Sequence, residues 1–229
     1  MLNSERFLNQ FVTVEMILKD MLKVNQYSFV KMVHLASKKD ATINRYQNDL
    51  LELAQLRNAI VHNRTSDEKA IAEPHDDVLV LIDKIVLQLE KPPRIKNLKL
   101  QNVFTIQNDF YLDELSLIQE KYNYSVVPVY RDGVYEGCVH ARLYQKAFQF
   151  KDNGIKTASD LLKLGNYHNR LPFVSQQKKL IDLVNEFNAS YQKGKGIIAY
   201  LVTESGKENE RIQGIITPAD MPGIIKHLE

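Results

Sequence analysis

The chain has 229 residues, of which 44% are hydrophobic and 25% are charged. This composition is typical of a folded protein with one large or two ordinary domains, and it excludes a largely disordered chain. Up to residue 95 the chain has 13 basic residues (Lys and Arg) and 13 acidic residues (Asp and Glu), and beyond residue 95 it has 17 basic and 15 acidic ones. The formal net charge is +2. This near balance in both parts excludes a broadly basic nucleic-acid-binding surface.

Residues 1 to about 91 show the spacing of amphipathic helices. A first helix is predicted from apolar residues that recur every three or four positions between Phe7 and Leu22. A second covers residues 27–36, and a third runs from a cap at Asp40 or Thr42 to about residue 62. A fourth has Pro74 in its first turn and a broad apolar face over residues 78–89. The four predicted helices indicate a bundle.

The pair Pro92-Pro93 marks the predicted domain boundary, because proline cannot continue a helix and disfavours helical backbone in the residue before it. We expect a helical domain over residues 1–91, a linker over 92–100 and a second domain over 101–229. The fold class is therefore α+β.

The second domain is predicted to contain an internal repeat of strand-helix-strand-strand-helix units. The first copy, about 101–152, has extended stretches at 102–106, 125–130 and 134–139 and helical ones at 111–122 and 143–150, with Asp132-Gly133 as a hairpin turn. The second, about 168–229, has extended stretches at 171–174, 196–203 and 212–216, a helix at 180–187 and a closing helix from Pro218. Units this small are expected to pack against one another.

The stretch Gly214-Ile215-Ile216-Thr217-Pro218-Ala219-Asp220 resembles the signature of CBS domains, named after cystathionine β-synthase. The resemblance implies a tandem CBS pair that binds AMP, ATP or a related adenine nucleotide between its repeats. Thr217 would then meet a phosphate at a helix N-terminus, and Asp220 would accept from the ribose hydroxyls. The alternative is that Thr217 is only a helix cap and Asp220 only a first-turn carboxylate.

The first repeat keeps the glycine, as Gly137, but has His140 and Leu143 where the signature has Thr217 and Asp220. We therefore expect at most one competent site, although Arg142 offers a cation to a phosphate. Val126, Val127 and Phe173 are expected to line the adenine slot.

The helical part carries Arg57-Asn58-Ala59-Ile60-Val61-His62, which is similar to the Arg-x4–6-His motif of HEPN domains. The resemblance implies a four-helix HEPN-like bundle, commonly a homodimer, that binds or cleaves RNA without a metal. Histidine titrates near neutrality, and arginine remains charged and forks onto phosphate oxygens. Arg57, Asn58 and His62 are the catalytic candidates.

Helical geometry separates these three side chains. At about 100° per residue, Asn58 and His62 lie about 40° apart, whereas Arg57 and His62 lie about 140° apart, so two copies would assemble a site better than one. The alternative is structural: Arg57 pairs with an acid or covers apolar surface, and His62 caps a helix C-terminus.

The remaining motifs point to no cofactor or metal. His75 with Asp76 and Asp77 is explained by a helix start, and Cys138, the single cysteine, excludes a disulfide and favours a core position. No apolar run approaches the roughly 20 residues of a membrane span, and a signal peptide is not visible. We expect a soluble, cytoplasmic protein.

Two functions from different classes follow. The first is an adenine-nucleotide-sensing CBS pair that regulates an RNA-binding or RNA-cleaving HEPN module. The second is a non-catalytic nucleotide sensor whose helical bundle docks a partner protein. No cofactor is required in either, and the nucleotide is a regulatory ligand.

Overall fold

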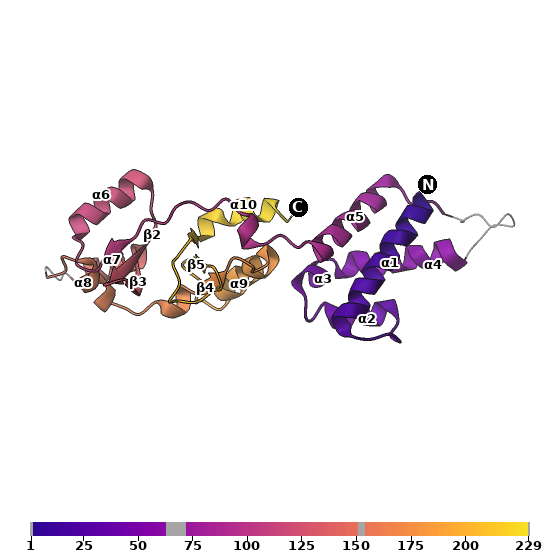
Figure 1. Cartoon of the computed structure of the whole chain (residues 1–229), viewed down its shortest axis with the longest axis horizontal. Coiled ribbons are helices and arrows are strands. Elements are labelled where there is room, and N and C mark those ends of the chain that lie inside the picture. Colours follow the sequence, from indigo (N-terminus) through magenta and orange to yellow (C-terminus); the bar gives the residue numbers. More distant parts are fainter. Residues whose placement is uncertain (1, 63–71, 151–153, 229) are drawn as a thin grey trace. The chain divides into compact units, whose positions relative to one another are not determined.

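The computed structural model describes residues 2–62, 72–150 and 154–228. It divides into two compact units, Met1–Pro93 and Arg94–Glu229 (Figure 1). The first is helical, and the second contains two three-stranded sheets with helices. The α+β class predicted from the sequence is confirmed. Within the described ranges, no helix is long and apolar enough to cross a membrane.

The described part of the first unit contains five helices that share one apolar core. They are α1 (Asn3–Leu22), α2 (Phe29–Ala36), α3 (Ala41–Arg45), α4 (Gln47–His62) and α5 (Asp76–Glu90). Helix α1 packs against α2, α4 and α5. Phe7, Val14, Met32 and Ile82 are completely buried in this core, as their helical spacing predicts.

The third helix predicted from the sequence is divided in two at Tyr46. Asp40 caps α3, since its Oδ1 accepts from the N–H groups of Thr42 and Ile43 at 2.8 and 3.2 Å. Tyr46 then has φ −98° and ψ 16°, which ends α3 before α4 begins. The apolar residues have the same spacing in α3 and in α4, so the sequence pattern does not show that the helix is interrupted at Tyr46.

The start of α5 also differs from the prediction. Pro74 lies before the helix rather than in its first turn, and Asp76 and Asp77 take the first-turn positions that the helix dipole favours. The segment before α5 is bonded to the start of α1: Glu73 accepts from the N–H and hydroxyl of Ser4 at 2.9 and 2.7 Å. These bonds lower the pKa of the Glu73 carboxyl. Residues 63–71, between the third and fourth helices predicted from the sequence, lie outside the described ranges.

The second unit contains two repeats with the same topology. The first has β1 (Ile106–Gln107), α6 (Leu112–Tyr122), β2 (Val126–Arg131), β3 (Val134–His140) and α7 (Ala141–Phe150), followed by α8 (Ala158–Lys163). The second has η2 (His168–Arg170), β4 (Phe173–Ser175), α9 (Leu180–Gln192), β5 (Tyr200–Thr203), β6 (Gly214–Ile216), η3 (Pro218–Asp220) and α10 (Met221–Lys226). In each sheet the first strand is parallel to the second, and the second is antiparallel to the third. The predicted repeat is confirmed.

The hairpin between β2 and β3 turns at Asp132 and Gly133. Both residues have positive φ, 49° and 82°, as expected for a tight turn that matches the twist of two antiparallel strands.

The two repeats share an apolar cluster. It contains Val126, Tyr135 and Cys138 from the first repeat and Leu171, Ala199, Leu201 and Ile212 from the second. The Tyr135 and Phe173 rings meet edge to face with centroids 5.1 Å apart. Cys138 is only 1% exposed, so its predicted place in the core is confirmed. The repeats therefore pack on one another, as units too small for separate cores require.

The segment that precedes β1 is attached to the second repeat. Its short 3-10 turn, η1 (Ile95–Asn97), has Ile95 completely buried. The N–H groups of Ile95 and Lys96 donate to the carbonyl oxygens of Lys178 and Gln176 at 3.0 and 2.9 Å. Residues 94–97, which the sequence suggested as linker, thus belong to the second unit, and they position the chain that follows them.

Candidate ligand-binding site

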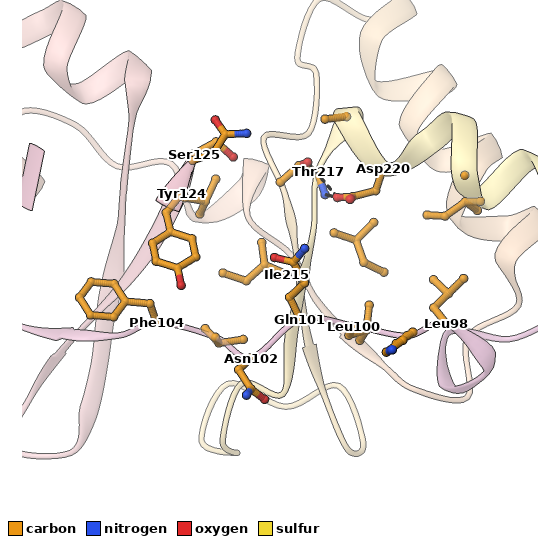
Figure 2. Close-up of a pocket in the computed structure, with 18 of the residues that line it drawn as sticks. Leu98, Leu100, Gln101, Asn102, Phe104, Tyr124, Ser125, Ile215, Thr217 and Asp220 are labelled. Carbon is orange, nitrogen blue, oxygen red and sulfur yellow. Dashed lines mark hydrogen bonds between the residues drawn. The ribbon is translucent and has the colours of Figure 1, made fainter. Parts of the chain in front are cut away.

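The second unit contains a cavity of about 610 Å³. Three segments form its walls: residues 98–104 before β1, residues 123–126 that lead into β2, and the end of β6 with the turn and helix after it. Figure 2 shows Phe104 and Tyr124 on one side and Thr217 and Asp220 on the other. The Phe104 and Tyr124 rings are stacked, with centroids 5.5 Å apart.

Gly214 lets the wall formed by residues 98–104, here called the strap, lie close to β6. A Cβ atom at Gly214 would be 2.4 Å from Cδ1 and 3.0 Å from Cβ of Leu100. The closeness of the Leu100 Cβ means that a side-chain rotation alone would not relieve the contact. The glycine of the sequence signature is therefore required here for close approach of the strap.

Thr217 and Asp220 are bonded to each other at the cavity wall. Oδ2 of Asp220 accepts from the Thr217 N–H at 2.7 Å and from the Thr217 hydroxyl at 2.9 Å (Figure 2). Within the described residues no donor is bonded to Oδ1. This oxygen is available to a ligand that carries hydroxyl groups.

Three of the six residues expected to bind a nucleotide line this cavity: Thr217, Asp220 and Val126. Val127 instead lies in the core of the first repeat, because successive strand residues point to opposite faces. Phe173 packs against Tyr135 between the repeats. Arg142 is exposed at the start of α7 and is not part of the lining.

The strap is the part of the site that sequence reasoning missed. All seven of its residues, Leu98 to Phe104, line the cavity. The only local signal was the alternation of Leu98 and Leu100 with polar residues. The partner of Leu100 on β6, Gly214, is more than 110 residues away in the sequence, so short-range patterns did not reveal the contact.

The equivalent position in the first repeat has a smaller cavity, about 260 Å³, whose lining includes Gly137, Leu143 and Tyr167. His140, where the second repeat has Thr217, is 2% exposed, and its ring meets that of Tyr167 edge to face at 4.6 Å. Leu143, where the second repeat has Asp220, is buried in the core. Arg170 donates through Nε to the carbonyl oxygen of Gly196 at 2.7 Å.

The His140 imidazole is held in its neutral form. Burial lowers its pKa to about 4, and the positive charges of Arg142 and Arg170 act in the same direction. Neither ring nitrogen has a hydrogen-bond partner among the described residues. A neutral, buried ring and the apolar Leu143 thus replace the Thr–Asp pair of the other half.

The structure places the helical motif on α4. Nη1 of Arg57 donates to Oδ1 of Asn58 at 3.2 Å. Arg57 is half-buried, whereas Asn58 and His62 are exposed, and His62 is the last residue of the helix. The residues after it, 63–71, lie outside the described ranges. In the ranges that are described, no cluster of three or more potential metal ligands occurs.

Comparison with known proteins gave matches only to solved structures. No family model matches the chain, and no curated protein matches it. The CBS domain pair of protein MJ0100, in complex with 5′-methylthioadenosine and S-adenosyl-L-methionine, is 17% identical, covers 60% of this chain and 99% of its own, and has a TM-score of 0.46. CBSX2 in complex with AMP is 14% identical over 59% and 98% of the two chains, with a TM-score of 0.42. A putative acetoin utilization protein, AcuB, from Vibrio cholerae is 19% identical over 59% and 91%, with a TM-score of 0.42.

Proposed function

We propose that the second unit is a CBS-type pair that binds an adenine nucleoside or nucleotide and regulates the helical unit. The observation that carries the proposal is the cavity with apolar walls on one side and the Thr217–Asp220 pair on the other. Oδ1 of Asp220 accepts from the ribose hydroxyls. The base lies against apolar side chains such as Val126 and Ile215, as small-molecule sites require.

The strap provides a covalent route from ligand to helical unit. Only residues 91–97 separate the end of α5 from the first strap residue, Leu98. A ligand changes the helical unit only if it binds one arrangement of the strap better than another. Regulation therefore requires that the strap differ between the free and the bound protein.

Isothermal titration calorimetry of the full chain with AMP tests the proposed site. Asp220→Ala removes the ribose acceptor and is expected to weaken AMP binding by about tenfold or more, because a hydrogen bond to a charged group contributes about 1.5–3 kcal/mol.

The chain offers a matched control in α8. Asp160 accepts from the N–H and the hydroxyl of Thr157 at 3.1 and 2.8 Å, which repeats the local bonding of Asp220 and Thr217 away from the cavity. Asp160→Ala removes the same two bonds to a threonine, together with an ion pair to Lys163, and it is expected to leave AMP binding unchanged. Equal loss in both variants, or binding that survives Asp220→Ala, contradicts the proposed site.

For the helical unit we propose RNA binding or metal-independent cleavage through Arg57, Asn58 and His62 in a homodimer. The Asn58 oxygen holds the Arg57 guanidinium at 3.2 Å, which leaves other guanidinium N–H groups for a phosphate. The test is incubation of the full chain with RNA, with and without AMP, in buffer that contains a metal chelator. His62→Ala is expected to abolish cleavage, and His75→Ala, an exposed histidine at the start of α5, is expected to retain it.

The second candidate function is a non-catalytic sensor whose helical unit docks a partner protein. It is favoured by large apolar side chains that the first unit exposes, among them Met16 at 64% and Val80 at 66%. Cleavage that is identical in wild type and His62→Ala, or absent in every ligand state, selects this function instead.

A further inference from the structure

The cavity offers few positive charges to a ligand. Of the described residues that line it, Lys99 and Asp220 carry full charges, His227 adds an imidazole, and no arginine is present. Lys99 and Asp220 are both exposed, so water screens both charges, and the single lysine is the only full positive charge among the described lining residues. Sites for di- and triphosphates ordinarily present several cations or a metal ion to the phosphate oxygens.

Most of the Thr217–Asp220 groups that would meet a phosphate are already bonded within the protein. The Thr217 N–H and hydroxyl both donate to Asp220. Pro218 has no N–H, and the Asp220 N–H donates to the Thr217 carbonyl oxygen at 3.1 Å. A phosphate would have to displace these bonds, beside a carboxylate that repels it.

The same arrangement suits a nucleoside. The Asp220 Oδ1 accepts hydroxyl hydrogens, whereas it repels an anion. The stacked Phe104 and Tyr124 rings, together with Leu98, Leu100 and Ile215, give most of the remaining wall an aromatic and aliphatic character. A planar base and a ribose diol match these two sides of the cavity.

We infer that the cavity selects adenosine ligands whose 5′ substituent carries at most one phosphate, and that it discriminates against ADP and ATP. This inference rests on the proposed function, since it specifies which adenine ligand the site takes. Lys99 is the cation available to a single phosphate. Each further phosphate adds negative charge that the lining residues do not neutralise, and it increases repulsion from Asp220.

Titration calorimetry of the full chain with adenosine, AMP, ADP and ATP, in magnesium-free buffer at constant ionic strength, tests the inference. We expect ATP to bind at least about tenfold more weakly than adenosine and AMP. ATP affinity equal to or above that of AMP overturns the inference and leaves the proposed function intact. Binding of none of the four ligands overturns both.

Two variants test the charges themselves. Asp220→Asn keeps an oxygen that accepts from Thr217 but removes the negative charge, so the ratio of ATP to adenosine affinity is expected to rise severalfold. Lys99→Gln is expected to weaken AMP but not adenosine. Lys96→Gln changes an exposed lysine of the preceding turn that does not line the cavity, and it is expected to change neither. An unchanged ratio in Asp220→Asn, or equal effects of both lysine variants, counts against the inference.

Discussion

The pH dependence of stability gives a quantitative prediction centred on His140. This residue is 2% exposed in the first repeat, with its ring against Tyr167. The charged groups that act on it are Arg142, two residues along the chain, and Arg170 of η2, and both oppose its protonation. A protonated imidazole at this position would be a buried cation among positive charges.

The magnitude follows from the pKa. Burial lowers the pKa of His140 from 6.5 to about 4, and a difference of this size corresponds to about 3 kcal/mol at about 1.36 kcal/mol per pH unit. Between these values the unfolded chain binds a proton that the folded chain does not. The free energy of unfolding therefore keeps this contribution above pH 6.5 and loses it as the pH falls towards 4.

The assay is urea unfolding of the full chain at several pH values between 7 and 4.5, with tyrosine fluorescence as the signal. Nine of the eleven tyrosines lie beyond residue 93, so the signal reports chiefly on the second unit. Other groups also titrate in this range, and subtraction of the His140→Leu curve from that of the wild type isolates the contribution of His140. His227→Leu, which replaces an exposed histidine of the same unit, is the matched control.

If the free energy of unfolding depends on pH in the same way for the wild type and His140→Leu between pH 7 and 4.5, the prediction is contradicted. Should His140→Leu fail to fold, the wild type alone decides the matter by nuclear magnetic resonance. The imidazole Hε1 shift of His140 is expected to stay constant between pH 7 and 5, and a midpoint near 6.5 contradicts the prediction.

Three further predictions concern packing at Gly214, helix capping by Asp40 and the reactivity of the Cys138 thiol. Gly214→Ala displaces Leu100 and is expected to destabilise the second unit by about 1–3 kcal/mol in urea unfolding, whereas Gly223→Ala, whose Cβ meets nothing within 4 Å, is expected to be neutral or stabilising. Asp40→Ala removes the cap of α3, so the first unit should lose about 1 kcal/mol of thermal or urea stability; no loss contradicts the capping role. Burial raises the pKa of the Cys138 thiol to about 12, so a thiol reagent such as Ellman's reagent should label it only in denaturant, and rapid labelling of the native chain shows that its strand opens.

Local patterns were sufficient for most of the fold. The spacing of Phe7 to Leu18 predicted α1, and Asp132-Gly133 predicted the turn between β2 and β3. The division at Tyr46 escaped prediction because a bend that preserves the apolar face leaves the periodicity unchanged. Helix ends that depend on bonds between distant residues are likewise not visible in a local pattern. The start of α5 is an example, because Glu73 just before it is bonded to Ser4.

The candidate site was predictable only where its residues are close in the sequence. Thr217 and Asp220 are three residues apart in a recognisable turn, and the structure places both at the cavity. Val127 lies in the core of the first repeat and not at the cavity, because its strand has two faces and the sequence pattern does not say which one faces the cavity. The strap depends on the contact of Leu100 with Gly214, which only the folded chain brings together.

On the proposed function, the difference between the two repeats favours a single ligand site. Both keep a glycine before the signature turn, and both place a leucine against it: Leu100 lies 2.4 Å from a Cβ built on Gly214, and Leu162 lies 3.1 Å from one built on Gly137. The close packing of a leucine on the signature glycine is thus common to both halves. What distinguishes them is the side chains that follow, since His140 is a buried ring where the other half has Thr217 at the cavity wall. On the proposed function we therefore expect the ligand in the cavity lined by the strap, which residues 91–97 join to the helical unit.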